Sequence, residues 1–170
     1  MYTIGRYTLF FLIYSFVGSL IETLYRLITE GQLYGIHGFL HHLPILPIYG
    51  FGALIVILLA RKVRHPFLLF VLSALAASVL EFVTSWGIEM VLGTRIWDYS
   101  NDPLNLFGRV DLFSSIGFGL VALLLVYYIH PLVSKLIKHL TQRTTIVIAS
   151  VVWVVLLTDT VISFVQRLKH

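Results

Sequence analysis

Apolar residues along the chain gather in long runs that short polar stretches separate. Four runs reach the roughly 20 residues that a membrane-spanning helix needs, at about residues 5–28, 66–92, 111–133 and 144–166. A fifth run, at about residues 46–61, is shorter, and Pro44 and Pro47 stand where it begins. We therefore expect the chain to enter this run as a broken or interfacial segment. The pattern predicts an all-α polytopic membrane protein of about five transmembrane helices. Outer loops rich in glycine, proline and aromatic residues join them, in one transmembrane domain over residues 1–170.

The composition fits a membrane protein and excludes several other classes. Of the 170 residues, 58% are hydrophobic and only 12% are charged, which is far from the balance of a soluble domain. The chain has no cysteine, so neither a disulfide framework nor a thiolate metal site can form. The first run contains Glu22 and lacks a small-x-small cleavage site, so we interpret it as a retained helix and not as a signal peptide.

The charged residues are distributed unevenly between the two ends of the predicted helices. With the N-terminus in the cytoplasm, seven of the twelve Lys and Arg residues lie on the cytoplasmic side, as the positive-inside rule favours. These are Arg6, Arg61, Lys62, Arg64, Lys135, Lys138 and Arg143. All eight acidic residues then fall in the outer half of the membrane or outside it, and we expect the functional chemistry to face outward. Because the basic residues are scattered in short loops, we predict no nucleic-acid partner.

Two of the predicted helices carry polar residues along one face. At about 100° per residue, four polar residues of the run at 66–92 fall within an arc of roughly 80°: Ser78, Glu81, Ser85 and Glu89. The first run has a comparable stripe with Gly18 beside it: Ser15, Ser19, Glu22 and Arg26. Ionisable groups inside a membrane are rare and usually mark pathways or sites, so we expect the two stripes to face each other. The alternative is that they hold a small bundle together through interhelical hydrogen bonds and ion pairs.

A weak internal repeat suggests a possible architecture. Ile21-Glu22 is followed, 28 residues after the glutamate, by Gly50-Phe51-Gly52, and Ile88-Glu89 is followed at the same spacing by Gly117-Phe118-Gly119. This spacing predicts two parallel helix-hairpin repeats, at about residues 10–62 and 77–133, with an extra helix at about 144–166. The glycines would let the returning helices pack close to their neighbours.

The first outer loop contains three histidines, His37, His41 and His42. Adjacent histidines project in different directions in regular structure, and no His-x-x-x-His pair lies on a predicted helix. We therefore interpret them as interfacial residues, and we predict neither a metal site nor a cofactor.

The second outer loop, residues 93–111, is the richest candidate region. Trp97 and Tyr99 fit the aromatic belt of a membrane protein, whereas Leu104, Leu106 and Phe107 are too apolar for a freely solvated loop. We therefore expect the segment to fold back onto the mouth of the bundle. There Arg109 would pair with Glu81, Glu89 or Asp111, or would hold an anionic ligand such as a phosphate or carboxylate. The other polar residues of the loop that call for an explanation are Arg95, Asp98 and Asn105.

Four motifs between about Tyr14 and Gly119 support a resemblance to a known family. They read YSFVGSLIETLY, PIYGFG, E-x-x-TSW-x-x-E and WDYS-x-x-x-x-N-x-x-GR. On these motifs the chain resembles the CmpB-like family of bacterial membrane proteins, labelled type IV ABC-transporter permeases. The positions characteristic of that family would be Glu22, Gly38, Phe39, Pro47, Tyr49, Gly50, Glu81, Ser85, Trp86, Glu89, Trp97, Asp98, Tyr99, Asn105, Gly108 and Arg109.

The chain departs from the family pattern at four positions. Leu46 and Asp111 stand where cysteines commonly occur, His37 stands where an arginine occurs, and Ser19 where a tryptophan occurs. The resemblance implies a multi-pass protein of the bacterial plasma membrane that takes part in solute transport driven by a separate ATPase. The chain itself contains no phosphate-binding loop, and its cytoplasmic loops at about 61–65 and 134–143 are short for docking an ATPase.

The residues and the resemblance together favour a small transport or permease-like protein. Its outward-facing Glu/Arg cluster would bind a cation, a proton or a small polar ligand. The candidate ligand-binding residues are Glu22, Glu81, Ser85, Glu89, Trp97, Asp98, Tyr99, Asn105, Arg109 and Asp111. The expected partners are membrane lipid, an ion or small-molecule ligand, and either a second copy of the chain or another membrane subunit.

Two alternatives stay open at this point. A membrane enzyme could act on a lipid or lipid-linked substrate at the outer leaflet, with a glutamate as general base and with Arg109 and Asn105 holding a phosphate. The sequence has no clear nucleophile pair and no metal signature, so we favour a non-enzymatic function. The other alternative is a non-catalytic accessory subunit of a membrane complex.

Overall fold

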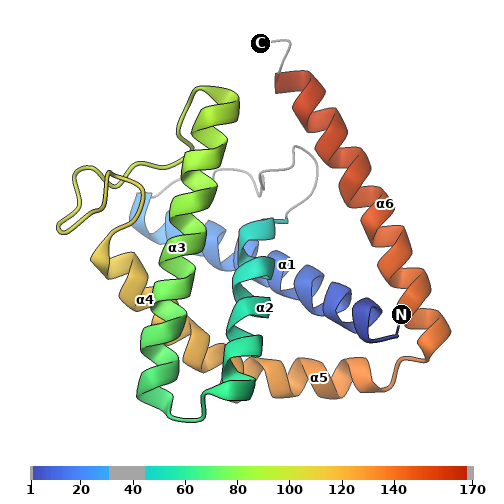
Figure 1. Ribbon diagram of the computed structural model, residues 1–170. Coiled ribbons are helices and arrows are strands. Elements are labelled where there is room, and N and C mark those ends of the chain that lie inside the picture. Colours follow the sequence, from blue (N-terminus) through green and yellow to red (C-terminus); the bar gives the residue numbers. More distant parts are fainter. Residues whose placement is uncertain (1, 31–44, 168–170) are drawn as a thin grey trace. The chain divides into compact units, whose positions relative to one another are not determined.

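The computed structural model describes residues 2–30 and 45–167, which are folded into helices joined by short connections and one longer loop (Figure 1). In chain order the helices are α1 (Tyr2–Glu30), α2 (Pro47–Lys62), α3 (Pro66–Leu92), α4 (Leu112–Leu124), the π-helical turn η1 (Leu125–Ile129), α5 (His130–Lys138) and α6 (Gln142–Arg167). The chain divides into two compact units. One comprises Met1–Phe51 with Val133–His170, and the other comprises Gly52–Leu132.

Four helical stretches of the described chain are long and apolar enough to cross a membrane. They are Ile4–Tyr25, Pro66–Leu92, Leu112–Lys138 and Gln142–Ile162. The side chains of Val79 and Val83 on α3 are 63% and 54% exposed in the isolated chain, as expected for a helix whose neighbours are lipid tails. The protein is therefore all-helical in its described part and crosses the membrane several times. With 16 residues, α2 is about 24 Å long, shorter than the roughly 30 Å hydrocarbon layer, so the fifth span stays a prediction.

In the first unit, α1 packs against α6 through small and aromatic residues. The indole Nε1 of Trp153 donates a hydrogen bond to Thr8 Oγ1 over 3.2 Å, and the rings of Phe11 and Trp153 stack with centroids 6.1 Å apart. A Cβ added to Gly5 would lie 3.0 Å from Thr145 Cγ2. Small residues of this kind let two membrane helices approach closely where no hydrophobic force drives them together.

The first turn of α2 also packs on α1. A Cβ at Gly50 would lie 2.6 Å from a ring carbon of Phe11 and 2.7 Å from its carbonyl oxygen. The backbone N–H of Leu46, just before the helix, donates to the carbonyl oxygen of Ser15 over 3.3 Å. The glycine therefore sets the distance between the two helices at this point.

In the second unit, α3 and α4 lie side by side. The hydroxyls of Ser78 and Ser115 are 2.7 Å apart and hydrogen-bonded. At Gly119, an added Cβ would lie 2.6 Å from the Phe70 ring. The polar stripe of α3 therefore begins with a contact to α4 and does not face lipid there.

Local sequence signals fix the ends of α3 and α4. Pro66 opens α3 after an extended His65, and Gly93 ends it in the left-handed conformation at φ +69°, where its N–H donates to Glu89 O over 2.8 Å. A proline at the first helical position and a glycine just past the last one are favoured for these reasons. Asp111 caps α4, because its Oδ1 accepts from the N–H groups of Phe113 and Ser114 over 2.7 and 3.0 Å.

The third membrane-spanning stretch contains α4, η1 and α5 in succession. Pro131 has no N–H and cannot donate to the carbonyl of Tyr127, four residues earlier. The π-helical turn Leu125–Ile129 directly precedes this region, which is the usual kind of position for such a turn in a helix that a proline disturbs.

Candidate functional site

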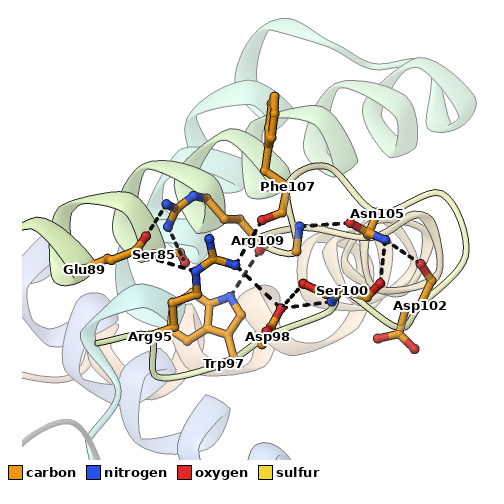
Figure 2. A network of polar contacts seen from close by, with 11 residues as sticks. Ser85, Glu89, Arg95, Trp97, Asp98, Ser100, Asp102, Asn105, Phe107 and Arg109 are labelled. Carbon is orange, nitrogen blue, oxygen red and sulfur yellow. Dashed lines mark hydrogen bonds and ion pairs between the residues drawn. The ribbon is translucent and has the colours of Figure 1, made fainter. Parts of the chain in front are cut away.

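The loop that joins α3 to α4, residues 93–111, has a folded structure of its own (Figure 2). The N–H of Tyr99 donates to Gly108 O over 2.8 Å, and Leu106 forms an isolated antiparallel bridge with Val110. Asn105 ties the loop together from the inside. Its Nδ2 donates to Asp102 O over 2.8 Å, and its Oδ1 accepts from Gly108 N over 2.9 Å. Asn105 therefore acts on the loop backbone.

Backbone conformation makes Gly108 necessary at its position. Its φ is +68°, and an added Cβ would lie 2.5 Å from Asp98 Oδ1 and 3.1 Å from Arg95 Nη1. Two residues of the same loop, Leu104 and Phe107, also have positive φ, both at 56°. Such angles are uncommon outside glycine, and they are found where the surrounding structure holds the chain in place.

Two arginines from the loop converge on one carboxylate of α3. Arg109 is buried and donates from Nη1 to Ser85 Oγ over 3.2 Å and from Nη2 to Glu89 Oε2. Arg95 donates from Nε to Glu89 Oε1 over 3.2 Å, so each oxygen of Glu89 has an arginine partner. The guanidinium of Arg109 also lies 5.8 Å from the centre of the Phe82 ring, within range of a cation–π interaction. Of the three acids expected as partners of Arg109, the structure selects Glu89.

Trp97 and Tyr99 donate hydrogen bonds that hold the loop together and join it to α3, respectively. The indole of Trp97 donates to the carbonyl oxygen of Arg109 over 3.1 Å. The hydroxyl of Tyr99 donates to Glu81 Oε1 over 2.9 Å. Glu81 is only 5% exposed and lies eight residues before Glu89, about 12 Å along the helix axis. The loop therefore reaches back along α3 through Tyr99, whereas Leu104, Leu106 and Phe107, the apolar residues expected to drive this contact, remain exposed.

Asp98 and Arg95 form the outer edge of the cluster. The backbone N–H of Ser100, at 3.0 Å, and the Ser100 hydroxyl both donate to Asp98 Oδ1. These two hydrogen bonds hold the pKa of the Asp98 carboxyl below its ordinary value because they favour its charged form. Arg95 Nη1 lies 3.7 Å from Asp98 Oδ1 and donates to Phe107 O over 3.2 Å, so Arg95 bridges the loop and α3.

Asp111 and Glu22 have other hydrogen-bond partners than the residues of this cluster. The hydrogen bonds described for the Asp111 carboxylate are those that cap α4, and the pairing with Arg109 considered for it is not observed. Glu22 belongs to the other compact unit, where its Oε2 accepts from the hydroxyl of Tyr49 over 2.5 Å. Gly18 makes room for the Tyr49 ring, because an added Cβ would collide with that ring. The expected meeting of Glu22 with Glu81 stays a prediction.

Several candidate residues lie outside the described part of the chain or have side chains that are not described. His37, His41, His42, Gly38 and Phe39 fall in residues 31–44. The side chain of Arg26 also belongs to this group. Within residues 2–30 and 45–167, no three His, Asp or Glu side chains come together as a metal site would require.

The structure adds three residues to the candidate set: Arg95, Ser100 and Ser115. The sequence singled out Arg95 without giving it a partner, although it lies six residues after Glu89, just beyond a glycine that reverses the chain. Ser100 had a recognisable signal, because a serine two residues after an aspartate often donates to it in a turn. Ser115 had none, because its role depends on the register between α3 and α4.

Comparison with known proteins then identifies the family. The sequence model of one family matches residues 9–164, which is most of the chain. This extends the resemblance of residues 14–119 in both directions. No curated protein and no solved structure matches the chain. With its several membrane-spanning helices the protein is transport-related, and it belongs to the family described as "Putative ABC-transporter type IV".

Proposed function

We propose that the protein is a permease-like membrane subunit in which the carboxylate of Glu81 binds a cation, a proton or a small polar ligand. The observation that carries this proposal is the burial of Glu81 inside a membrane-spanning helix, where the Tyr99 hydroxyl donates to it. A buried carboxylate in lipid is unfavourable unless it is paired, protonated or bound to a ligand. The family supports a transport role for such a group.

The arrangement of charges divides the acidic residues of α3 into two kinds. Glu89 contacts two guanidinium groups, so its negative charge is compensated by the protein itself. Glu81 is only 5% exposed, against 33% for the Glu89 side chain, and it accepts a hydrogen bond from the Tyr99 hydroxyl. Because Glu81 is the more deeply buried carboxylate of the two, we assign the ligand or proton to Glu81, and we assign to Glu89, Arg95 and Arg109 the task of holding the loop over it. Ser85, Trp97, Asp98 and Asn105 support that loop.

The proposal includes an orientation and a location. With the N-terminus in the cytoplasm, the loop after α3 lies outside the bacterial plasma membrane and the cluster opens outward. Five spans, with α2 as the short fifth, would bring the C-terminal end of α6 outside as well. A second copy or a separate ATPase subunit would complete the transport unit, because five helices enclose little room for a substrate path.

The test measures ligand-dependent stability of the full chain in a mild detergent. Thermal unfolding is followed by tryptophan fluorescence in NaCl, KCl or choline chloride at equal ionic strength, between about pH 5 and pH 8. Native mass spectrometry of the same samples detects small polar ligands that remain bound. We expect one cation, a change of pH or a retained ligand to alter the Tm of the wild type. We expect Glu81→Gln to remove that response.

Two further variants separate a ligand site from a structural one. Asp102→Asn removes an exposed carboxylate from the same loop and should leave the response intact. Tyr99→Phe removes only the hydroxyl that contacts Glu81 and should shift the ligand concentration or pH at which the response occurs. If wild type and Glu81→Gln respond alike and carry the same retained molecules, Glu81 is structural, and the accessory-subunit alternative replaces this proposal. A retained lipid-linked phosphate lost in Arg109→Gln but not in Glu81→Gln would favour the membrane-enzyme alternative.

A further inference from the structure

The end of the third membrane span has a structure that the proposed function does not use. The span Leu112–Lys138 contains 27 residues, or about 40 Å of helix, whereas the hydrocarbon layer is roughly 30 Å thick. Its last turns, which form α5, therefore extend into the headgroup region. Three residues, 139–141, separate Lys138 from the next span at Gln142, so the chain has no length in which to leave the membrane surface.

The side chains of α5 divide into a protein-facing side and an outward side. Ile137 is 4% exposed and faces the protein, whereas Leu132 and Leu136 are 61% and 73% exposed. Lys135 and Lys138 are exposed too. At about 100° per residue the two leucines lie on one half of the outward face and the two lysines on the other. The outward side of α5 thus has an apolar edge next to a basic edge.

The charged residues near α5 in the sequence are all of one sign. Residues 112–158 contain no Asp or Glu, whereas they include Lys135, Lys138 and Arg143. The backbone of the short connection is fixed, because Leu140 N donates to Ile137 O over 3.0 Å and Thr144 N donates to Thr141 Oγ1 over 3.2 Å. The two lysines are therefore held at the surface of the bilayer without an acidic neighbour in the sequence to neutralise them.

We propose that α5 is an interfacial helix that binds anionic phospholipid: Leu132 and Leu136 enter the acyl layer while Lys135 and Lys138 contact headgroup phosphates. An amphipathic helix with a basic polar face binds anionic bilayers by combining apolar burial with electrostatic attraction. Lipid is the occupant that fits both edges at once, because the helix continues a membrane span and ends where acyl chains meet headgroups. The inference is independent of any ligand at Glu81.

The natural lack of cysteine permits a clean test with a single label. His139→Cys, labelled with an environment-sensitive fluorophore, is placed in nanodiscs of phosphatidylcholine alone or with one quarter phosphatidylglycerol. We expect the emission to shift to shorter wavelength in the anionic nanodiscs. Added NaCl should reverse the shift, because salt screens exposed charges.

Two double variants decide whether the lysines are responsible. K135Q/K138Q should lose the difference between the two nanodiscs, and K135R/K138R, which keeps both charges, should retain it. The tryptophan emission of each variant verifies that the fold is intact, and the salt titration of the wild type does not depend on any variant. Equal emission of the wild type in both nanodiscs overturns the proposal. So does a Gln variant that responds like the wild type, or a label that is shielded in every lipid, which would indicate a protein partner.

Discussion

Arg95 and Arg109 both contact the Glu89 carboxylate, but their side chains differ in burial, so the loss of each should have a different effect on stability. The Arg109 side chain is 10% exposed and that of Arg95 is 32% exposed. Arg109 also fills a place between Ser85 and the Phe82 ring. A partly exposed ion pair contributes little, whereas a buried group that loses its partner leaves an unsatisfied polar atom behind. Arg109 should therefore hold the loop on α3 and Arg95 should only strengthen that contact.

Replacement of each arginine by glutamine tests this difference. We expect Arg109→Gln to lower the stability of the protein by roughly twice as much as Arg95→Gln. Arg109→Lys should not restore it, because an ammonium group lacks the planar fork that contacts Ser85 and Glu89 together. The measurement is unfolding in dodecyl maltoside by titration with sodium dodecyl sulfate. Equal losses for the two glutamine variants would contradict the assignment.

A pH dependence follows from Asp98. Hydrogen bonds from Ser100 lower the pKa of its carboxyl. A group whose pKa is lower in the folded state stabilises that state above its unfolded pKa, about 3.9 for aspartate. The contribution disappears as the pH falls through the folded pKa.

We expect Ser100→Ala to destabilise the loop at neutral pH and the difference from wild type to vanish in acid. The fluorescence emission of Trp97, in a protein with Trp86 and Trp153 replaced by Phe, follows the unfolding of the loop at each pH. A difference that is as large in acid as at neutral pH would contradict this cause.

At the scale of the helix, the two Gly-Phe-Gly motifs do not use equivalent glycines. In α2 the first glycine, Gly50, makes the close contact, and Gly52 is at an ordinary 3.7 Å from Leu80. In α4 the second glycine, Gly119, contacts the Phe70 ring, and nothing lies within 4 Å of a Cβ at Gly117. The motif therefore predicts close packing of both helices without predicting which glycine provides it.

Alanine substitution in α4 should separate these two glycines. Gly119→Ala forces a methyl group against Phe70, and we expect a loss of about 1–3 kcal/mol, typical of overpacking. Gly117→Ala has open space and a better helix propensity, so it should be neutral or slightly stabilising. Unfolding of both variants by detergent titration gives the comparison. Equal effects would indicate that α3 and α4 are not as close at Gly119 as the structure has them.

The N-cap of α4 is a second feature at the scale of the helix. The Asp111 carboxylate accepts both of its described hydrogen bonds from N–H groups in the first turn of α4, and replacement of such a cap by alanine typically costs about 1 kcal/mol. The sequence offered this signal, because an aspartate directly precedes a long apolar run. The preference for aspartate at a helix N-cap therefore accounts for the described hydrogen bonds of Asp111, whereas its role as a ligand stays a prediction.

For the molecule as a whole, hydropathy predicted the helices well because the bilayer imposes a simple length rule. The run at about 66–92 coincides with α3. The stripe through Ser78, Glu81, Ser85 and Glu89 contacts α4 and the loop, whereas the expected contact with the polar stripe of the first helix stays a prediction. The sequence predicted an acidic partner for Arg109 but could not show which of three acids it would be. The choice depends on the turns of an irregular loop, including positive φ at Leu104 and Phe107, residue types that do not signal that conformation.

The membrane topology can be tested with the same cysteine-free background. Arg64 and Asp102 flank α3 on its two sides in the sequence, both exposed, and a helix that crosses the bilayer must place them on opposite sides. We expect a membrane-impermeant maleimide added to intact cells to label Asp102→Cys and to label Arg64→Cys only after the cells are broken. Labelling of both from outside would contradict α3 as a span, and the reverse pattern would invert the orientation.

The pairing of Glu89 with Arg109 has a consequence for how the protein is made. The two residues are 20 positions apart, and a ribosome adds about 5–20 residues per second. The carboxylate therefore precedes its guanidinium partner by roughly one to four seconds. During that interval the newly synthesised end of α3 bears a negative charge that the membrane disfavours. Arg95, the other partner of Glu89, follows after six residues, so we expect the end of α3 to become fully compatible with the bilayer only when the rest of the loop has followed.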